Sequence, residues 1–201
     1  MNDSISKKLH TVLYGTRKQT IGNLLTAFEE KSFAFIFVLL MALPALPIPT
    51  GGLVHVFEVI VVFLAIQLVI GRQSLWLPQF LAKKPLPKTL RDGILKKLNT
   101  YIMWVEQHSK RRAAFLVSSR WAIAFHAISI IVFTAFAFFA PPFTGLDTLP
   151  SLGVVVMSLA IILDDGLILL LGYLIGIIGC VVVVGLGAGV VTAVGQLFSI
   201  F

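Results

Sequence analysis

The sequence predicts an all-α integral membrane protein, a helical bundle of short helix pairs that are broken at proline and glycine. Of the 201 residues, 58% are hydrophobic and only 12% are charged, whereas soluble globular proteins have roughly 25% charged residues. Several apolar runs approach the roughly 20 residues that a helix needs to cross the hydrocarbon core of a bilayer. Clusters of proline and glycine separate these runs. The length suits a single membrane domain over residues 1–201.

Two helix pairs account for most of the apolar sequence. The first pair spans 32–71 and is interrupted by prolines and glycines at 44–52, and the second spans 121–163 with its interruption at 141–145. Proline removes a backbone donor and clashes with the preceding turn, so a helix cannot continue through such a segment. Each pair is therefore either a tight hairpin or a re-entrant pair that meets inside the membrane, where protein or water must shield the broken backbone.

The two pairs also predict an internal repeat. Pro-Ile-Pro-Thr-Gly at 47–51 is matched by Pro-Pro-Phe-Thr-Gly at 141–145, and Leu-Ala-Ile at 64–66 is matched by the same tripeptide at 159–161. The order is the same and the spacing agrees within one residue. Such a repeat implies two related helix pairs, as in transporters with internal symmetry.

The remaining segments differ in character. Residues 1–31 alternate apolar and charged positions at helical spacing, which predicts an amphipathic helix lying on the membrane surface. Residues 72–120 form a basic cytoplasmic or interfacial segment with a second such helix. The tail at 166–201 has no charge and predicts either one strongly tilted span or two shorter helices. Its glycines favour a break near 185–189 or close helix packing.

The charge distribution favours a membrane over nucleic acid as the partner. The net charge is +7, and all 16 lysines and arginines lie between Lys7 and Arg120. Basic residues that flank apolar spans are typical of cytoplasmic loops that meet anionic lipid headgroups. We therefore expect 1–31 and 72–120 on the cytoplasmic side, and no nucleic-acid binding.

The sequence contains no recognisable catalytic or metal-binding motif. The single cysteine, Cys180, excludes an intrachain disulfide, and no cysteine or histidine spacing suits a metal. Phosphate-binding loops, nucleophile elbows and zinc-protease signatures are all missing. We expect no enzymatic activity and no cofactor.

Polar residues inside the apolar runs are the candidate functional residues, because charge within a span is costly. Glu58 is the clearest of them, with His55 three residues earlier on the same helix face and Gln67 further along. One interpretation is an ion or proton relay, or recognition of a polar headgroup. The other is a structural pair of Glu58 with His55, or with His126 or Arg120 from another helix.

Five further residues are candidates with a structural alternative. The place of His126, one to two turns into its apolar run, favours an interhelical hydrogen bond over the binding of a ligand. Asp164 and Asp165 lie either at a membrane surface or at an interior helix break, where the N-terminus of the next helix stabilises a carboxylate. Arg72 and Arg120 either hold phosphate groups through paired hydrogen bonds or anchor helix ends.

Several of these positions belong to a pattern that resembles the ExoD family. The pattern comprises Ala-Leu-Pro-Ala-Leu-Pro-Ile-Pro-Thr-Gly at 42–51, Gln67 followed by Gly71-Arg72, Trp76-Leu77-Pro78, and Asp165-Gly166. The resemblance extends from about Ser32 to Tyr173. It implies a multi-pass protein of the bacterial inner membrane that is linked to exopolysaccharide production, and it brings no known catalytic residue.

Together these observations give two functional hypotheses. The first is a homodimeric inner-membrane protein that supports exopolysaccharide synthesis or export as a small transporter or flippase for an anionic or lipid-linked substrate. The alternative is an accessory or scaffold protein that binds membrane lipids or a polysaccharide synthase without transporting anything.

Overall fold

The computed structural model describes residues 31–47, 53–72, 79–85, 115–141 and 144–198, together with isolated positions between 11 and 23 and between 75 and 103. The two predicted surface helices fall largely outside these described residues.

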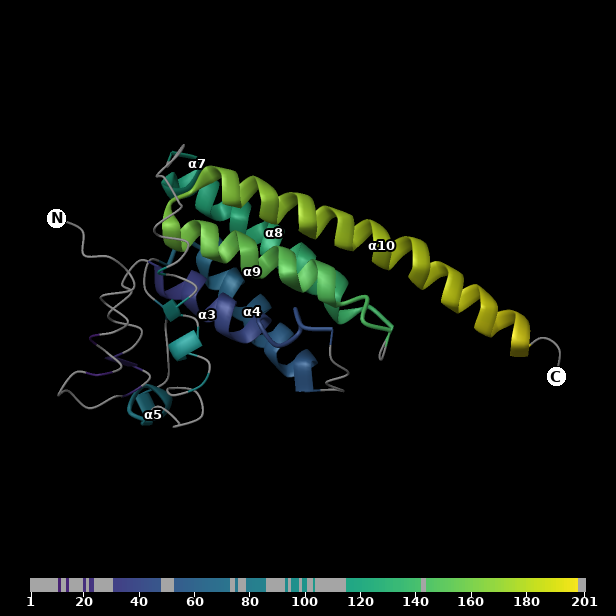
Figure 1. The fold of residues 1–201 in the computed structure, drawn as a ribbon, viewed down its shortest axis with the longest axis horizontal. Helices are drawn as coiled ribbons and strands as arrows, with labels where there is room; N and C mark the ends of the chain where they lie inside the picture. Colours follow the sequence, from purple (N-terminus) through teal and green to yellow (C-terminus); the bar gives the residue numbers. More distant parts are fainter. Residues whose placement is uncertain are drawn as a thin grey trace.

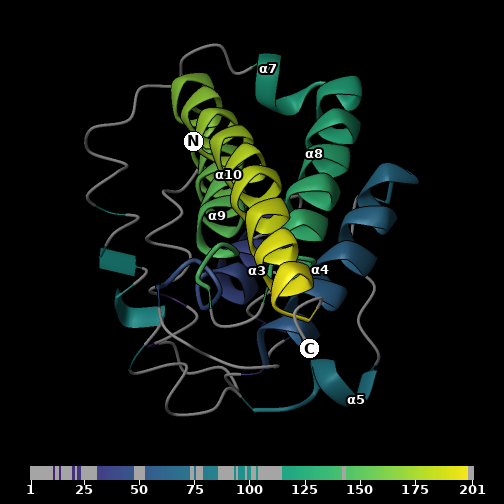
Figure 2. The ribbon, with the colours of Figure 1, turned by 90° about the vertical axis from the view of Figure 1, so that its right-hand side faces the viewer.

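The described part of the chain is all-helical, as predicted (Figure 1). Its helices are α3 (Ser32–Met41), α4 (Leu53–Val69), α5 (Gln79–Ala82), α7 (Phe115–Ser118), α8 (Arg120–Phe138), α9 (Thr148–Leu163) and α10 (Gly166–Phe198). α3 packs against α4 and α9, α4 packs against α8, and α10 covers α9 (Figures 1 and 2). Their shared core is apolar and contains Phe33, Phe37, Met41, Val61, Ile130, Val154 and Met157.

Contacts at the helix ends show the relative directions of α3, α4, α8 and α9. Lys31, just before α3, binds Asp164, just after α9, and the guanidinium of Arg120 at the start of α8 lies beside Gly71 after α4. Both pairs of helices are therefore antiparallel. We call this side of the bundle, with Lys31, Gly71, Arg72, Arg120 and Asp164, the basic end. The opposite side is called the distal end.

The antiparallel pair α9 and α10 is in close backbone contact. A Cβ atom added at Gly153 would lie 2.5 Å from the Cα of Gly176, and one at Gly179 would lie 2.5 Å from the backbone nitrogen of Pro150. Only glycine permits such an approach, so the predicted close packing is present here.

Of the two alternatives for the tail, the structure has the single helix and not a break near 185–189. α10 runs without interruption over 33 residues, about 50 Å at 1.5 Å per residue, and extends beyond its neighbours (Figure 1). Glycine costs a helix only about 1 kcal/mol relative to alanine. In an apolar medium a break costs more, because the freed backbone groups find no partner.

In the part of the chain that the structure describes, two helices are long and apolar enough to cross a membrane, namely Arg120–Phe138 and Gly166–Gly187. The apolar helices α3, α4 and α9 are shorter. Large hydrophobic side chains are exposed along the outer faces of α4, α8 and α10. The bundle therefore presents an apolar exterior of the kind that lipid covers.

Candidate functional site

A buried acid–imidazole pair lies inside the apolar bundle. The side chain of Glu58 is 0% exposed, and its Oε2 lies 2.8 Å from Nδ1 of His55, one turn earlier on α4. The His55 ring is partly exposed and packs edge-on against Phe138 at the end of α8, with ring centroids 4.9 Å apart. The pair therefore connects the distal end of the bundle with its interior.

The second carboxylate oxygen of Glu58 is unsatisfied. Oε1 is buried and has no hydrogen-bond partner among the residues that the structure describes. Burying a polar atom without a partner costs about 1–3 kcal/mol, and more for a charged group. A proton, an ion or a polar ligand at Oε1 would remove this cost.

Other polar atoms surround Glu58 at the distal end. Thr134 on α8 and Ser151 on α9 are both fully buried, and neither hydroxyl has a partner within the described part of the chain. Asp147, which precedes α9, is close enough for its charge to act on Glu58. We call these four residues, together with His55, the distal polar layer.

Gln67 does not belong to this layer. It lies on α4 about two and a half turns closer to the basic end, where its side chain is buried. Both polar atoms of its amide lack a partner in the described region.

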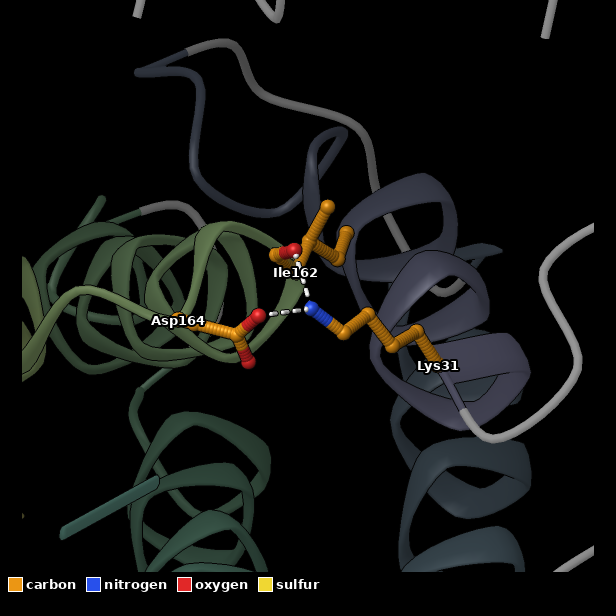
Figure 3. Close-up of polar contacts among 3 residues, drawn as sticks. All are labelled: Lys31, Ile162 and Asp164. Atoms are coloured by element: carbon orange, nitrogen blue, oxygen red, sulfur yellow. Dashed lines mark hydrogen bonds and ion pairs between the residues drawn. The ribbon is translucent and has the colours of Figure 1, made fainter. Parts of the chain in front are cut away.

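At the basic end, a lysine joins two helices that are far apart in the sequence (Figure 3). Nζ of Lys31 donates to Oδ2 of Asp164 at 2.7 Å and to the carbonyl oxygen of Ile162 at 2.8 Å. Asp164 ends α9 in the left-handed conformation, with φ of 56°. The ammonium group thus lies at the negative end of the α9 dipole. Sequence reasoning missed Lys31, although it is the last cation before the first apolar run.

The carboxylate of Asp165 caps the next helix. It is buried, and its Oδ1 accepts a hydrogen bond of 2.9 Å from the backbone N–H of Leu167 at the start of α10. This is the stabilisation by a helix N-terminus that the second interpretation of the aspartate pair predicts.

Arg72 and Arg120 are exposed at the basic end. No carboxylate among the described residues forms a salt bridge with either one. Arg120 lies at the end of the bundle opposite His55 and Glu58, so it does not pair with Glu58.

His126 is a structural tie between helices. Its Nδ1 accepts a hydrogen bond from the hydroxyl of Tyr173 at 2.6 Å, and its Nε2 donates to the carbonyl oxygen of Leu116 at 2.8 Å. Both ring nitrogens are used, and they join α7, α8 and α10. The structural interpretation of His126 therefore agrees with its contacts.

Within the described residues, no group of three or more histidine, cysteine or acidic side chains is placed to hold a metal ion.

Comparison with known proteins identifies the family. The ExoD family, described as exopolysaccharide synthesis, matches residues 5–185. The chain belongs to the ExoD family. This ExoD chain is also similar to an uncharacterized protein of Synechocystis sp., with 30% identity over 155 residues that cover 74% of this chain and 69% of that protein. No solved structure matches it significantly. ExoD membership implies involvement in exopolysaccharide synthesis, and together with the apolar helices it indicates a membrane protein.

Three of the positions that carry the ExoD resemblance have visible folding roles. Gly71 adopts φ of 90° at the end of α4, which glycine does without strain. Asp165 caps α10, and Pro44 is buried directly after α3. His55 and Glu58 lie outside that pattern.

Proposed function

We propose that this ExoD chain is a multi-pass protein of the bacterial inner membrane that supports exopolysaccharide synthesis or export as a small transporter for an anionic or lipid-linked substrate. The observation that carries the proposal is the fully buried Glu58, bound to His55 through one oxygen and unpartnered at the other among the described residues. A charged group inside a membrane bundle is costly and marks an ion or substrate pathway by default. We assign no catalytic activity to the chain.

The charge distribution supports an orientation. The basic end contains Lys31, Arg72 and Arg120, and cations of membrane proteins concentrate on the cytoplasmic side. The basic end then faces the cytoplasm, and the distal polar layer lies toward the periplasm.

The helix arrangement supports an internal repeat. The pairs α3–α4 and α8–α9 both start at the basic end and return to it. α3 packs against α9, and α8 packs against α4. In both contacts the first helix of one pair packs against the second helix of the other pair. A cation also precedes or begins the first helix of each pair and contacts the residue after the last helix of the other pair. Lys31 contacts Asp164, and Arg120 contacts Gly71. Asp164 and Gly71 both have positive φ. These features support two parallel repeats about an axis along the bundle.

The length of α3 supports a re-entrant first pair. Its 10 residues extend about 15 Å, half of the roughly 30 Å hydrocarbon core. The Pro/Gly break then lies within the membrane.

The repeat is unequal at the basic end, which supports an anionic substrate. Asp164 neutralises Lys31, whereas the residue that lies beside Arg120 is Gly71, which carries no charge. Arg120 and Arg72 thus remain available to a phosphate group. Because one chain encloses little polar volume, we propose that two copies form the pathway.

One observation favours the alternative, an accessory protein that binds lipids or a polysaccharide synthase. The outer face of α10 exposes a continuous row of large apolar side chains, including Leu167, Leu170, Leu174, Ile177 and Val181. A partner helix could cover this row as well as lipid does.

A reconstitution experiment tests the proposal. Purified protein in proteoliposomes is assayed for ion flux and for movement of fluorescent anionic lipid, beside Glu58→Gln and Arg72→Ala. Lys84→Ala is the matched control, because it removes another exposed cation. Transport by wild type and Lys84→Ala, lost in the other two, supports the proposal. If purified protein moves neither lipid nor ion, and both variants still support polysaccharide production in cells, the transporter hypothesis fails. Co-purification of a synthase would then favour the accessory role.

A further inference from the structure

Three helices each contribute to the distal polar layer one buried oxygen atom that has no partner among the described residues. They are Oε1 of Glu58 on α4, Oγ1 of Thr134 on α8 and Oγ of Ser151 on α9. All three side chains are 0% exposed. Leaving three such atoms unsatisfied in an apolar bundle is unfavourable, and a ligand bound by all three would remove this cost.

The register of α4 and α8 places two of these atoms opposite each other. The contact between His55 and Phe138 aligns the two antiparallel helices at the distal end. Glu58 lies one turn after His55 on α4, and Thr134 lies one turn before Phe138 on α8. Because residues four apart lie on one helix face, Thr134 faces α4 at the level of Glu58.

The third atom comes from the inner face of α9. Ser151 lies one turn after Asp147, whose charge acts on Glu58, so these residues share the face turned toward Glu58. Pro150, Gly153 and Met157 face α10 instead. Ser151 therefore points into the bundle at the level of the acid.

We propose that Glu58, Thr134 and Ser151 bind a monovalent cation of the sodium class through these three oxygen atoms. Carboxylate and hydroxyl oxygens are hard ligands that suit alkali and alkaline-earth ions rather than transition metals. A single carboxylate balances a single positive charge, and this favours a monovalent ion in an apolar interior.

Two other titratable groups lie near the carboxylate of Glu58. His55 binds it from α4, and Asp147, just before α9, acts on it through its charge. α3 and α10 contain no charged residue, and Arg120 of α8 lies at the basic end. The partly exposed His55 marks the access from the distal end. The proposed function gives this site its role, because the cation would be the coupling ion of the transporter.

Cation binding is measured directly on the purified full-length protein. Thermal unfolding is followed in NaCl and in choline chloride at equal ionic strength. We expect a saturable rise of Tm with Na⁺, abolished in Glu58→Gln. Thr134→Val and Ser151→Ala each remove one ligand, and we expect each to raise the apparent Kd for Na⁺ about tenfold.

Two variants separate binding from folding. Thr134→Ser keeps the hydroxyl and should keep Na⁺ binding. Ser158→Ala removes another buried, unpartnered hydroxyl from α9, about two turns closer to the basic end, and should leave the Kd unchanged. The proposal is overturned if wild type shows no response to Na⁺, if Glu58→Gln responds equally, or if Ser158→Ala loses as much as Ser151→Ala. A Tm that follows pH alone would assign a proton to the site instead.

The same preparations distinguish this inference from the proposed function. Proteoliposomes that move lipid in the absence of Na⁺, with no Na⁺ binding, refute the cation site and retain the transporter. Na⁺ binding by protein that moves no lipid retains the site and refutes the transporter.

Discussion

The contact between α9 and α10 is so close that a single methyl group should disrupt it. In Gly153→Ala the new Cβ would lie 2.5 Å from the Cα and 2.7 Å from the nitrogen of Gly176. Ordinary contacts lie at 3.4–4 Å, so α10 must move away by about 1 Å, and a gap of that size forfeits a quarter to a half of each dispersion contact. Both opposing atoms belong to the backbone, so no side-chain rotation relieves the clash.

The expected cost is about 2–3 kcal/mol, at the upper part of the range for overpacked cores. For a chain of this size that lowers Tm by about 5–10 °C. The matched control is Gly185→Ala on α10, because nothing lies within 4 Å of its added Cβ. Alanine there should be neutral or stabilising by up to about 1 kcal/mol.

Unfolding of both variants in one detergent, followed by circular dichroism, measures the difference. If Gly153→Ala unfolds at or above the temperature of Gly185→Ala, the two helices are not in backbone contact and the packing is wrong.

Three further predictions concern the polar contacts between helices. Tyr173→Phe leaves Nδ1 of His126 without its donor and should cost about 1–3 kcal/mol; an unchanged Tm would contradict the tie. In a double-mutant cycle of Lys31→Ala and Asp164→Ala, we expect a coupling of up to about 1 kcal/mol, because both side chains are partly exposed; strict additivity would rule out their ion pair. Asp165→Ala removes the cap of α10 and should destabilise by about 1 kcal/mol, with much of the loss restored by Asp165→Asn.

The parts of the fold that local chemistry determines were predictable. Proline and glycine mark the breaks that separate α3 from α4 and α8 from α9. The pair of His55 and Glu58 follows from their spacing on one helix, since residues three apart share a face. The sequence left one or two helices open for the tail, because glycine propensity favours a break whereas the cost of unpaired backbone in an apolar medium opposes one.

The parts that depend on tertiary packing were not predictable. Lys31 and Asp164 are 133 residues apart, and only the antiparallel packing of α3 on α9 brings them together. Thr134 and Ser151 are ordinary polar residues of apolar helices. Their significance comes from the register of α4 and α8 and from the face of α9 that Asp147 shares.

The buried pair of His55 and Glu58 and the glycine contacts between α9 and α10 contribute differently to the stability of the fold. A buried pair such as His55 and Glu58 contributes little to folding, because desolvation offsets its attraction and apolar side chains in its place are often neutral or stabilising. The bundle must therefore be held closed by other contacts. α10 supplies them on the face of α9 that carries Gly153, whereas Ser151 lies on the inner face, toward Glu58. The close contact with α10 and the polar Ser151 thus lie on different faces of α9. A ligand can therefore enter or leave the distal polar layer without loosening the contact between α9 and α10.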